Sequence, residues 1–464
     1  MTYSPSTSAF TSTSTALPGD RPTTQIFCVS TLYGAATLAA AIDAGLFRPA
    51  ARRLLVVCNN AASPELHPGV DRMPGFGTLR DRFDDIVSWN ETIAPFHPKS
   101  WAPRSGDVPL WERHLRLAWA LGDDRVEVTV ESIQVNPALA IAEIFTGAPL
   151  TVYADGLMSY GPTRSKIDPL IGGRVRRLLH LDLVPGLAPL LLTEFGVEAE
   201  LVPSEEFRRV LEGLADAAED IGTPSVAPAL ILGQYLSALS VLTPQEEEEL
   251  HVEMVRGAAA LGHTRVVFKP HPAAPAAWSG LLADEAEKAG IELTVFDSPV
   301  LAEVLYQRLK PALVIGCFST ALFTASAFFG LPVARTGTAG LLERLSPYQN
   351  SNRVPVTIVD ALVTPLDDDG SFEPEARIGE LVTAVGYTMQ PQIHPGLRPA
   401  AEAYLSRHLD ERTWRFFKRR RLTGLGLPGG IPAQFAGIPR NATARRMVRR
   451  ARKLRQTVLR AGPR

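Results

Sequence analysis

Short apolar runs recur along the first half of the chain, separated by longer stretches of mixed polar and apolar positions. The runs, three to five residues long, lie at 26–29, 54–58, 85–87, 127–130 and 149–153. Runs of this kind are typical of strands buried on both faces of a parallel sheet, with helices in the stretches between them. The pattern predicts one α/β domain over residues 25–222. Residues 1–24 are rich in Ser, Thr and Pro and are expected to be disordered.

A second series of the same kind follows a Pro-containing linker at 222–228. Its apolar runs lie at 229–232, 265–268, 292–296, 313–316 and 331–334. The pattern predicts a second Rossmann-like domain over residues 229–400, followed by a basic helical tail over 401–464. Two such domains in tandem face each other across a cleft between the carboxyl ends of their strands, where ligands of open α/β sheets bind.

Charge is distributed unevenly along a chain whose net charge is only −2. Residues 401–464 carry 17 Lys and Arg against 3 Asp and Glu, whereas residues 1–400 carry 30 against 46. Apolar residues recur at near-helical spacing over 441–461, with basic residues on the other faces. A basic amphipathic helix of this kind fits anionic lipid or a polyanionic acceptor chain. Nucleic acid is disfavoured because few aromatic residues accompany the basic ones.

The compartment is indicated by cysteine usage and by the absence of long apolar runs. Three cysteines in a chain of 464 residues favour a reducing compartment. The first residues lack the basic start and apolar core of a secretory signal, and no apolar run reaches the ~18 residues that span a membrane. The acidic run 367–369 lacks the spacing of a calcium loop, so no metal site is predicted. We therefore expect a cytoplasmic protein.

Two strand ends in the second half carry side chains suited to a phosphate. The run 265–268 leads into Lys269-Pro270-His271-Pro272, where the prolines fix the backbone and so direct the imidazole. The alternative is a rigid turn with a surface histidine. After the run 313–316, Ser319-Thr320 opens a helix whose free N–H groups can bind an anion, and simple helix capping is the alternative. No Gly-rich phosphate or dinucleotide motif is present.

One strand end in the first half carries an acid. Tyr153-Ala154-Asp155-Gly156 follows the fifth apolar run of that half. A carboxylate at a strand end, before a glycine that lets the chain turn, can act as a general base in the cleft. An ordinary Asp-Gly turn is the alternative.

Taken together, Asp155-Gly156, His271-Pro272 and Ser319-Thr320 resemble in order and spacing the motifs of bacterial sialyltransferases, and most closely the bacterial α-2,8-polysialyltransferase family. The resemblance covers residues 25–335. The family motif usually carries two acids before the glycine, and Ala154 occupies the place of the first.

The resemblance implies a GT-B fold and metal-independent, inverting transfer of sialic acid or a related nonulosonic acid from a CMP-sugar to a glycan hydroxyl, with no cofactor. Asp155 would be the general base, and His271 would stabilise or protonate the departing phosphate. Pro272, Ser319 and Thr320 would complete the phosphate site. We expect the enzyme to act on a cell-surface glycan or glycolipid precursor, such as capsule polysaccharide, on the inner face of the plasma membrane.

Other strand ends supply lesser candidates. Those expected near the nucleotide are Gly233, Gln234, Lys269, Ser298 and Glu303. Those expected to face the acceptor are Ser30, Thr31, Tyr33 and Gly34, with helix capping as the alternative for the first two. Two further interpretations of the whole chain remain: another GT-B transferase that uses a CDP-linked donor in cell-wall or capsule synthesis, and a non-catalytic scaffold on a decayed transferase fold.

Overall fold

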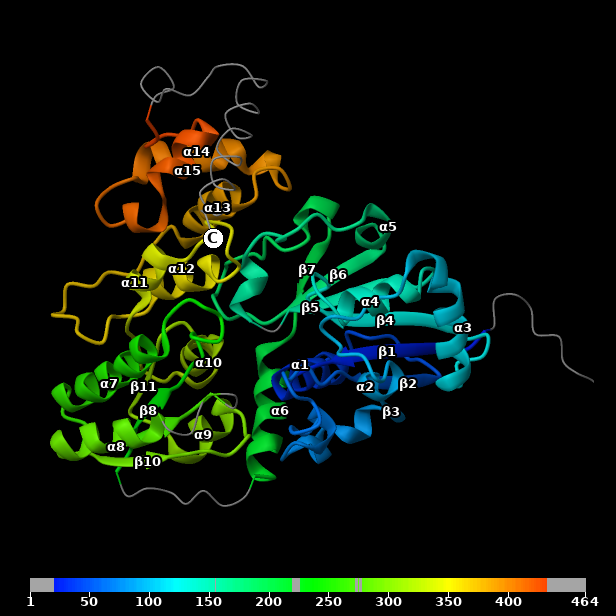
Figure 1. Ribbon diagram of the computed structural model, residues 1–464, viewed down its shortest axis with the longest axis horizontal. Coiled ribbons are helices and arrows are strands. Elements are labelled where there is room, and N and C mark those ends of the chain that lie inside the picture. The colour runs from blue at the N-terminus through cyan, green and yellow to red at the C-terminus, as the bar shows by residue number, and fades with distance from the viewer. Residues whose placement is uncertain (1–20, 155, 219–225, 272–273, 275–277, 432–464) are drawn as a thin grey trace, which may run out of the picture.

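The chain forms two parallel β-sheets, each with helices around it, that lie side by side (Figure 1). They belong to a computed structural model that describes residues 21–154, 156–218, 226–271, 274 and 278–431. The expected disordered segment and the expected tail helix over 441–461 lie outside these residues, apart from residues 21–24. Residues 23 and 24 are already part of the first strand.

The N-terminal sheet has seven strands in the order β3-β2-β1-β4-β5-β6-β7, and all neighbours are parallel. The strands are β1 (Thr23–Val29), β2 (Arg52–Val57), β3 (Asp85–Ser88), β4 (Arg125–Glu131), β5 (Leu150–Ala154), β6 (Val175–His180) and β7 (Glu198–Leu201). The five predicted runs coincide with β1 to β5. The pattern missed β6 and β7, because charged residues interrupt the first and three of the four residues of the second are exposed.

The helices of this half are α1 (Leu32–Asp43), α2 (Trp89–Thr92), α3 (Val108–Ala118), α4 (Ala138–Ile144), α5 (Pro169–Gly172) and α6 (Ser204–Asp216). The last of them lies between the two sheets and packs on both α1 and the C-terminal domain (Figure 1). Arg308 secures that second contact, since its Nη2 donates to the carbonyl of Ala215 at 2.7 Å.

The C-terminal sheet has five parallel strands in the order β10-β9-β8-β11-β12. They are β8 (Ala229–Leu232), β9 (Arg265–Lys269), β10 (Glu292–Val295), β11 (Leu313–Gly316) and β12 (Val333–Arg335), and the helices among them are α7 (Pro244–Ala260), α8 (Trp278–Lys288), α9 (Ala302–Leu309) and α10 (Thr320–Phe329). Thr243 and Glu246 form a capping box at the start of α7. Both sheets therefore have the predicted Rossmann-like topology.

Five helices complete the described chain. They are α11 (Thr338–Arg344), α12 (Arg353–Leu362), α13 (Ile378–Met389), α14 (Arg398–His408) and α15 (Arg419–Leu425). The predicted boundary at residue 400 falls inside α14, which packs along α13. Asp360 of α12 also holds Arg415 at 2.7 Å. The first part of the basic tail is thus packed against the preceding helices.

A single large core joins the two domains. It includes Phe27 and Tyr153 on one face of the N-terminal sheet and continues without interruption to Ile231 and Ile315 of the C-terminal sheet. A second cluster fills the other face of the N-terminal sheet, where Val128 and Val152 lie. One face of the seven-stranded sheet is therefore directed toward the other domain.

Candidate functional site

In each sheet the strand order reverses at one point, where a crevice forms at the carboxyl edge. In the C-terminal sheet this point lies between β8 and β11. Gln234, just after β8, bridges it, because its side-chain oxygen accepts a hydrogen bond of 2.9 Å from the backbone N–H of Phe318. The predicted Gln234 therefore lies at the ligand-binding end of the sheet and holds the loop that leads into α10.

The His-Pro segment lies at the end of β9, beside β8. The backbone N–H of Gly233 donates to the carbonyl of Lys269 at 2.9 Å. A Cβ on Gly233 would lie 3.0 Å from the ring of Phe268 and 3.1 Å from Cα of Pro270, so only glycine lets the two strand ends approach this closely. Gly233 thus positions the segment that carries His271.

His271 itself is exposed, with its ring centroid 6.2 Å from that of Tyr235 in the loop after β8. Desolvation by surrounding atoms lowers the pKa of His271, and the Lys269 ammonium acts in the same direction while the Glu247 carboxylate opposes it. The imidazole is therefore neutral at pH 7 and carries one N–H that can donate to an anion. Pro272, predicted beside it, lies outside the described residues.

Ser319 and Thr320 form the start of α10, as predicted. The Ser319 side chain caps the helix by accepting from Ala321 N at 3.2 Å. The Thr320 hydroxyl accepts from Leu157 N at 3.3 Å, across the domain boundary. β9 and β11 flank β8, so their ends lie roughly 10 Å apart. His271 and the positive end of α10 thus both lie at the carboxyl edge of this sheet, on either side of β8.

Lys269, which ends β9, and Glu303 of α9 are buried and interact electrostatically. Lys269 donates from Nζ to the carbonyl of Ser298 at 3.0 Å, and burial lowers its pKa to about 8. Burial raises the pKa of Glu303 to about 7, against the effect of its hydrogen bonds and of the Lys269 ammonium. Both side chains are less than a tenth exposed. A direct contact of Lys269, Ser298 or Glu303 with a nucleotide stays a prediction.

The predicted acceptor-side residues follow β1, and their side chains contact different elements. Thr31 caps α1, accepting from Gly34 N at 2.9 Å, so the capping alternative applies to it. The Tyr33 hydroxyl lies 3.1 Å from the Thr324 hydroxyl of α10, which ties α1 to the C-terminal domain. Ser30 instead points along the sheet edge and donates to Glu131 Oε2 at 2.5 Å. Contact of any of them with an acceptor stays a prediction.

Asp155 lies outside the described residues, but both of its neighbours are described. Ala154 ends β5, in register with His180 of β6. Gly156 begins the turn into the 3-10 helix η5 (Leu157–Tyr160), with extended backbone angles that any residue can adopt. A Cβ on Gly156 would lie 2.9 Å from the Thr320 hydroxyl. A glycine at this position lets the two domains touch.

Two carboxylates near these strand ends were not predicted from the sequence. Glu131 ends β4, and an acid directly after the apolar run 127–130 was the available signal. Glu247 of α7 is fully buried and accepts from Leu236 N at 2.5 Å and from Ser237 N at 2.7 Å, which fixes the loop after β8. It sits in an acidic run that resembles a solvated helix start, so nothing in the sequence marks it.

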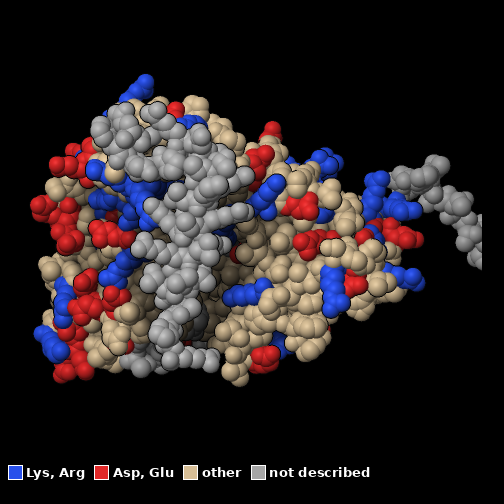
Figure 2. All heavy atoms as spheres, turned by 45° about the horizontal axis from the view of Figure 1, so that its top comes forward, with Lys and Arg blue, Asp and Glu red and all other residues tan. Residues whose placement is uncertain are grey.

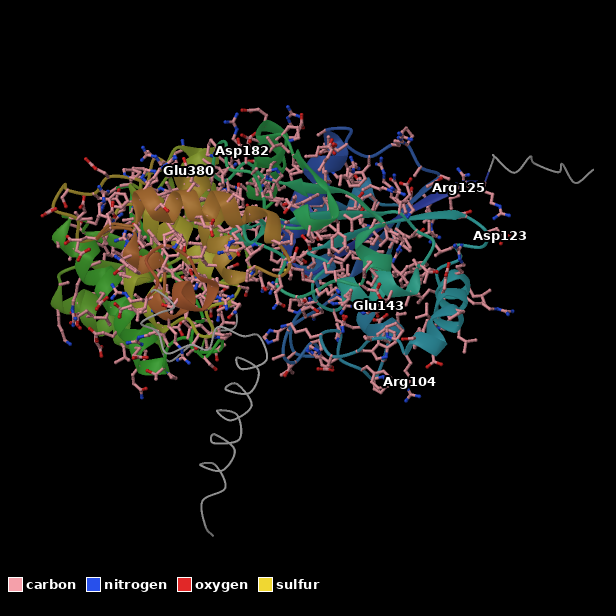
Figure 3. The ribbon with its side chains drawn as sticks, turned by 90° about the horizontal axis from the view of Figure 1, so that it is seen from above. Arg104, Asp123, Arg125, Glu143, Asp182 and Glu380 are labelled. Atoms are coloured by element: carbon pink, nitrogen blue, oxygen red, sulfur yellow. The ribbon has the colours of Figure 1, made fainter. Side chains whose placement is uncertain are left out.

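Away from these edges, a cavity of about 530 Å³ lies at the amino edge of the N-terminal sheet. Asp123 and Arg125 line it, at the end of the molecule remote from the C-terminal domain (Figure 3). Among the described residues, no three His, Cys, Asp or Glu side chains are grouped so that they could hold a metal ion. No helix in the described part of the chain is long and apolar enough to cross a membrane.

A family model described as alpha-2,8-polysialyltransferase (POLYST) matches residues 25–338. No curated protein matches the chain. Among solved structures, the chain is similar to a sialyltransferase from Photobacterium damselae (12% identity, 72% of this chain and 95% of that one, TM-score 0.37). It is also similar to a 2,6-sialyltransferase from Photobacterium sp. JT-ISH-224, solved in a ternary complex with the donor product CMP and the acceptor substrate lactose (12% identity, 73% of this chain and 76% of that one, TM-score 0.41). A third similar structure is that of Acinetobacter baumannii MurG (11% identity, 82% of this chain and 94% of that one, TM-score 0.40).

The matched segment spans more than half of the chain and contains the Asp-Gly, His-Pro and Ser-Thr segments. The facing Rossmann-like domains have the GT-B arrangement that the resemblance implies. The chain therefore belongs to the alpha-2,8-polysialyltransferase family and is a sialyltransferase-like glycosyltransferase.

Proposed function

We propose that the protein transfers sialic acid or a related nonulosonic acid from a CMP-linked donor to a glycan hydroxyl, with inversion and without a metal ion. One observation carries the proposal beyond family membership. The hydrogen bond from Leu157 N to Thr320 brings the turn after β5 against the start of α10. This contact supports the proposal, because it puts a strand end of the N-terminal sheet next to the helix start that we assign to the phosphate.

The carboxyl edge of the C-terminal sheet offers groups that suit a departing phosphate. The free N–H groups at the start of α10 and the positive end of its dipole favour an anion. The hydroxyls of Ser319 and Thr320 and a neutral His271 can add hydrogen bonds that are already oriented before the bond breaks. As the acceptor oxygen attacks the anomeric carbon, the bond between that carbon and an oxygen of the CMP phosphate breaks. The electrons of this bond stay on the phosphate oxygen. A carboxylate on the acceptor side takes the hydroxyl proton, and the family resemblance assigns that role to Asp155.

Ligand binding tests the identity of the donor. Thermal unfolding is measured with CMP, CMP-sialic acid, CDP-glycerol and UDP. We expect the first two to stabilise the protein and UDP to have no effect, since ligands that bind only the folded state raise its stability. Stabilisation by CDP-glycerol together with its turnover would favour the CDP-linked alternative. Stabilisation by UDP would contradict the proposal.

Substitution of the histidine tests the donor chemistry. His271→Ala should lower the rate of sialyl transfer by about 10²- to 10³-fold, the usual loss when an oriented donor to the developing charge is removed. His263→Ala is the matched control, because this histidine follows α7 on the same domain away from the strand ends. Equal rates for the two variants would exclude His271 from catalysis.

We also propose that the enzyme works on the inner face of the plasma membrane, held by its basic C-terminal region. In the described part of that region the exposed basic residues are Arg407, Arg412, Arg415, Arg419 and Arg420. Figure 2 shows Lys and Arg side chains gathered on the face that carries the C-terminal helices. Each basic residue near an anionic surface contributes ~1 kcal/mol. The protein should sediment with phosphatidylserine vesicles at low salt and not with phosphatidylcholine vesicles.

A further inference from the structure

A carboxylate other than Asp155, that of Glu131, lies where the strand order of the N-terminal sheet reverses. That point lies between β1 and β4. Ser30 follows β1 and Glu131 ends β4, and their side chains are hydrogen-bonded at 2.5 Å. Ligands of open α/β sheets bind at such a point, at the carboxyl edge. Glu131 is therefore located where a substrate of this domain is expected.

The register of the sheet shows which face Glu131 belongs to. Glu131 is paired with Tyr153 of β5. In-register residues of neighbouring parallel strands share a face, so Glu131 lies on the face of Tyr153. Tyr153 belongs to the core cluster that continues into the C-terminal domain. Glu131 therefore stands on the side of the sheet from which the donor domain approaches, one strand away from the turn that contacts Thr320.

The environment of Glu131 suits a group that takes up protons. The side chain is only partly exposed, and desolvation raises its pKa, while the hydrogen bond from Ser30 acts in the opposite direction. Among the described residues, the thiol of Cys58, directly after β2, is a titratable group that interacts with Glu131. This thiol is buried, with a pKa raised by desolvation, and stays uncharged at neutral pH. A partly desolvated carboxylate with one oriented donor is a stronger base than one in open water.

The backbone directly after Glu131 is strained. Ser132 and Ile133 have φ of 55° and 40°, in the left-handed region that β-branched residues avoid. Ile133 is fully buried, and its N–H donates to the carbonyl of Glu131 at 2.6 Å. Ser132 N donates to the carbonyl of Tyr153 at 3.0 Å. Such strain costs about 1–3 kcal/mol per residue and concentrates where a side chain is held for function. Here it fixes the end of β4.

We infer that Glu131 is a catalytic residue, the general base that accepts the proton of the acceptor hydroxyl. The acceptor oxygen forms its bond to the anomeric carbon with a lone pair. The O–H electrons stay on that oxygen, the proton passes to Glu131 and then to solvent, and the phosphate leaves with the electrons of the broken bond. The inference rests on the proposed function for the reaction itself. It differs from the family assignment by placing the proton on Glu131 of β4 and not on Asp155.

The test compares two glutamates of one strand. Glu131→Gln keeps the shape and the hydrogen bond from Ser30 but cannot take a proton. Glu127→Gln is the matched control, because Glu127 lies four residues earlier on the same face and also accepts from a β1 side chain, Gln25 Nε2, at 3.0 Å. We expect Glu131→Gln to lower kcat by about 10²- to 10⁴-fold with unchanged CMP affinity and thermal unfolding. Glu127→Gln should retain wild-type kcat.

The pH profile separates a base from a structural residue. A carboxyl with a raised pKa loses its charge as pH falls, so wild-type kcat/KM should decline on the acidic side. That decline should vanish from the residual activity of Glu131→Gln. In Ser30→Ala it should move to higher pH, because the hydrogen bond that favours the charged form is gone. Asp155→Asn, measured in parallel, should keep the decline.

Each outcome decides the inference. It is overturned if Glu131→Gln keeps kcat within threefold of wild type, or if the acidic decline persists in Glu131→Gln and vanishes in Asp155→Asn. A wild-type protein that binds no CMP and transfers no sialic acid would instead contradict the proposed function. The two failures are therefore distinguishable, since the first is defined only in an active wild-type enzyme.

Discussion

Gly156→Ala tests whether the contact between the domains at η5 is as close as the structure indicates. A Cβ on residue 156 would lie 2.9 Å from the Thr320 hydroxyl oxygen and 3.8 Å from the Thr320 Cβ and Cγ2. Ordinary van der Waals contacts begin at about 3.5 Å, so the two segments must separate by about 0.6 Å. Because the backbone at Gly156 is extended, alanine adds no conformational strain of its own. The whole effect arises from Thr320.

The magnitude follows from overpacking of a close contact. Gly156→Ala should reduce the free energy of unfolding by about 1–3 kcal/mol, and lower Tm by about 2–4 °C per kcal/mol for domains of this size. Thr320→Ala alone removes one hydrogen bond and should cost about 0.5–1.5 kcal/mol. In the Thr320→Ala background the obstructing hydroxyl is gone. In that background Gly156→Ala should leave the free energy of unfolding almost unchanged. The coupling energy between the two substitutions should therefore be about 1–3 kcal/mol.

The assay is thermal and urea unfolding of the wild type, the two single variants and the double variant. Gly213→Ala is the control, since a Cβ at this position in the last turn of α6 meets nothing within 4 Å. It should stabilise the protein by about 0.5–1 kcal/mol, because alanine favours a helix over glycine. An equal loss in free energy of unfolding on Gly156→Ala in the wild type and in the Thr320→Ala background would contradict this prediction. Such additivity would mean that the two residues do not touch.

Three further predictions concern buried charges. Glu247→Ala leaves two backbone N–H groups after β8 without their acceptor, so it should lower stability by about 2–5 kcal/mol in urea unfolding and weaken CMP binding. Asp360→Asn leaves the buried guanidinium of Arg335, now 3.2 Å from the carboxylate, without a counter-charge, and should cost about 3–5 kcal/mol in the same assay. The pKa of Glu303 is raised from 4.5 to about 7, so the folded state holds the proton more tightly and the wild type loses stability as pH rises from 4.5 to about 7. Glu303→Gln should flatten the dependence of Tm on pH over that window, and an unchanged slope would contradict the assignment.

Several features of the chain could be predicted from short segments. The apolar runs that became β1, β2, β4 and β5 were visible because a strand inside a covered parallel sheet needs an apolar stretch, and the weaker run at β3 belongs to an edge strand. The capped start of α7 was visible because Thr243, Pro244 and Glu246 interact within one turn. The positions of His271 and Ser319 at strand ends followed in the same way. Each of these depends only on residues that are near one another in the sequence.

Other features depended on contacts between distant segments. β7 has little apolar character, and it exists because β6 offers it a free edge. The tail boundary was predicted at residue 400 from charge, whereas α14 begins at Arg398 and packs on α13. Charge distribution indicates which surface is polar, but helix packing decides where a domain ends.

The side chains of the candidate site also depend partly on neighbouring residues and partly on contacts between distant segments. That carboxyl, imidazole and hydroxyl groups follow apolar runs can be seen in the amino-acid sequence, because each group is adjacent to its run. That β1 lies beside β4 can be seen only in the folded sheet, where Ser30 contacts Glu131 although 101 positions separate them. Strand order results from packing and crossover connections over the whole domain, and no local periodicity records it.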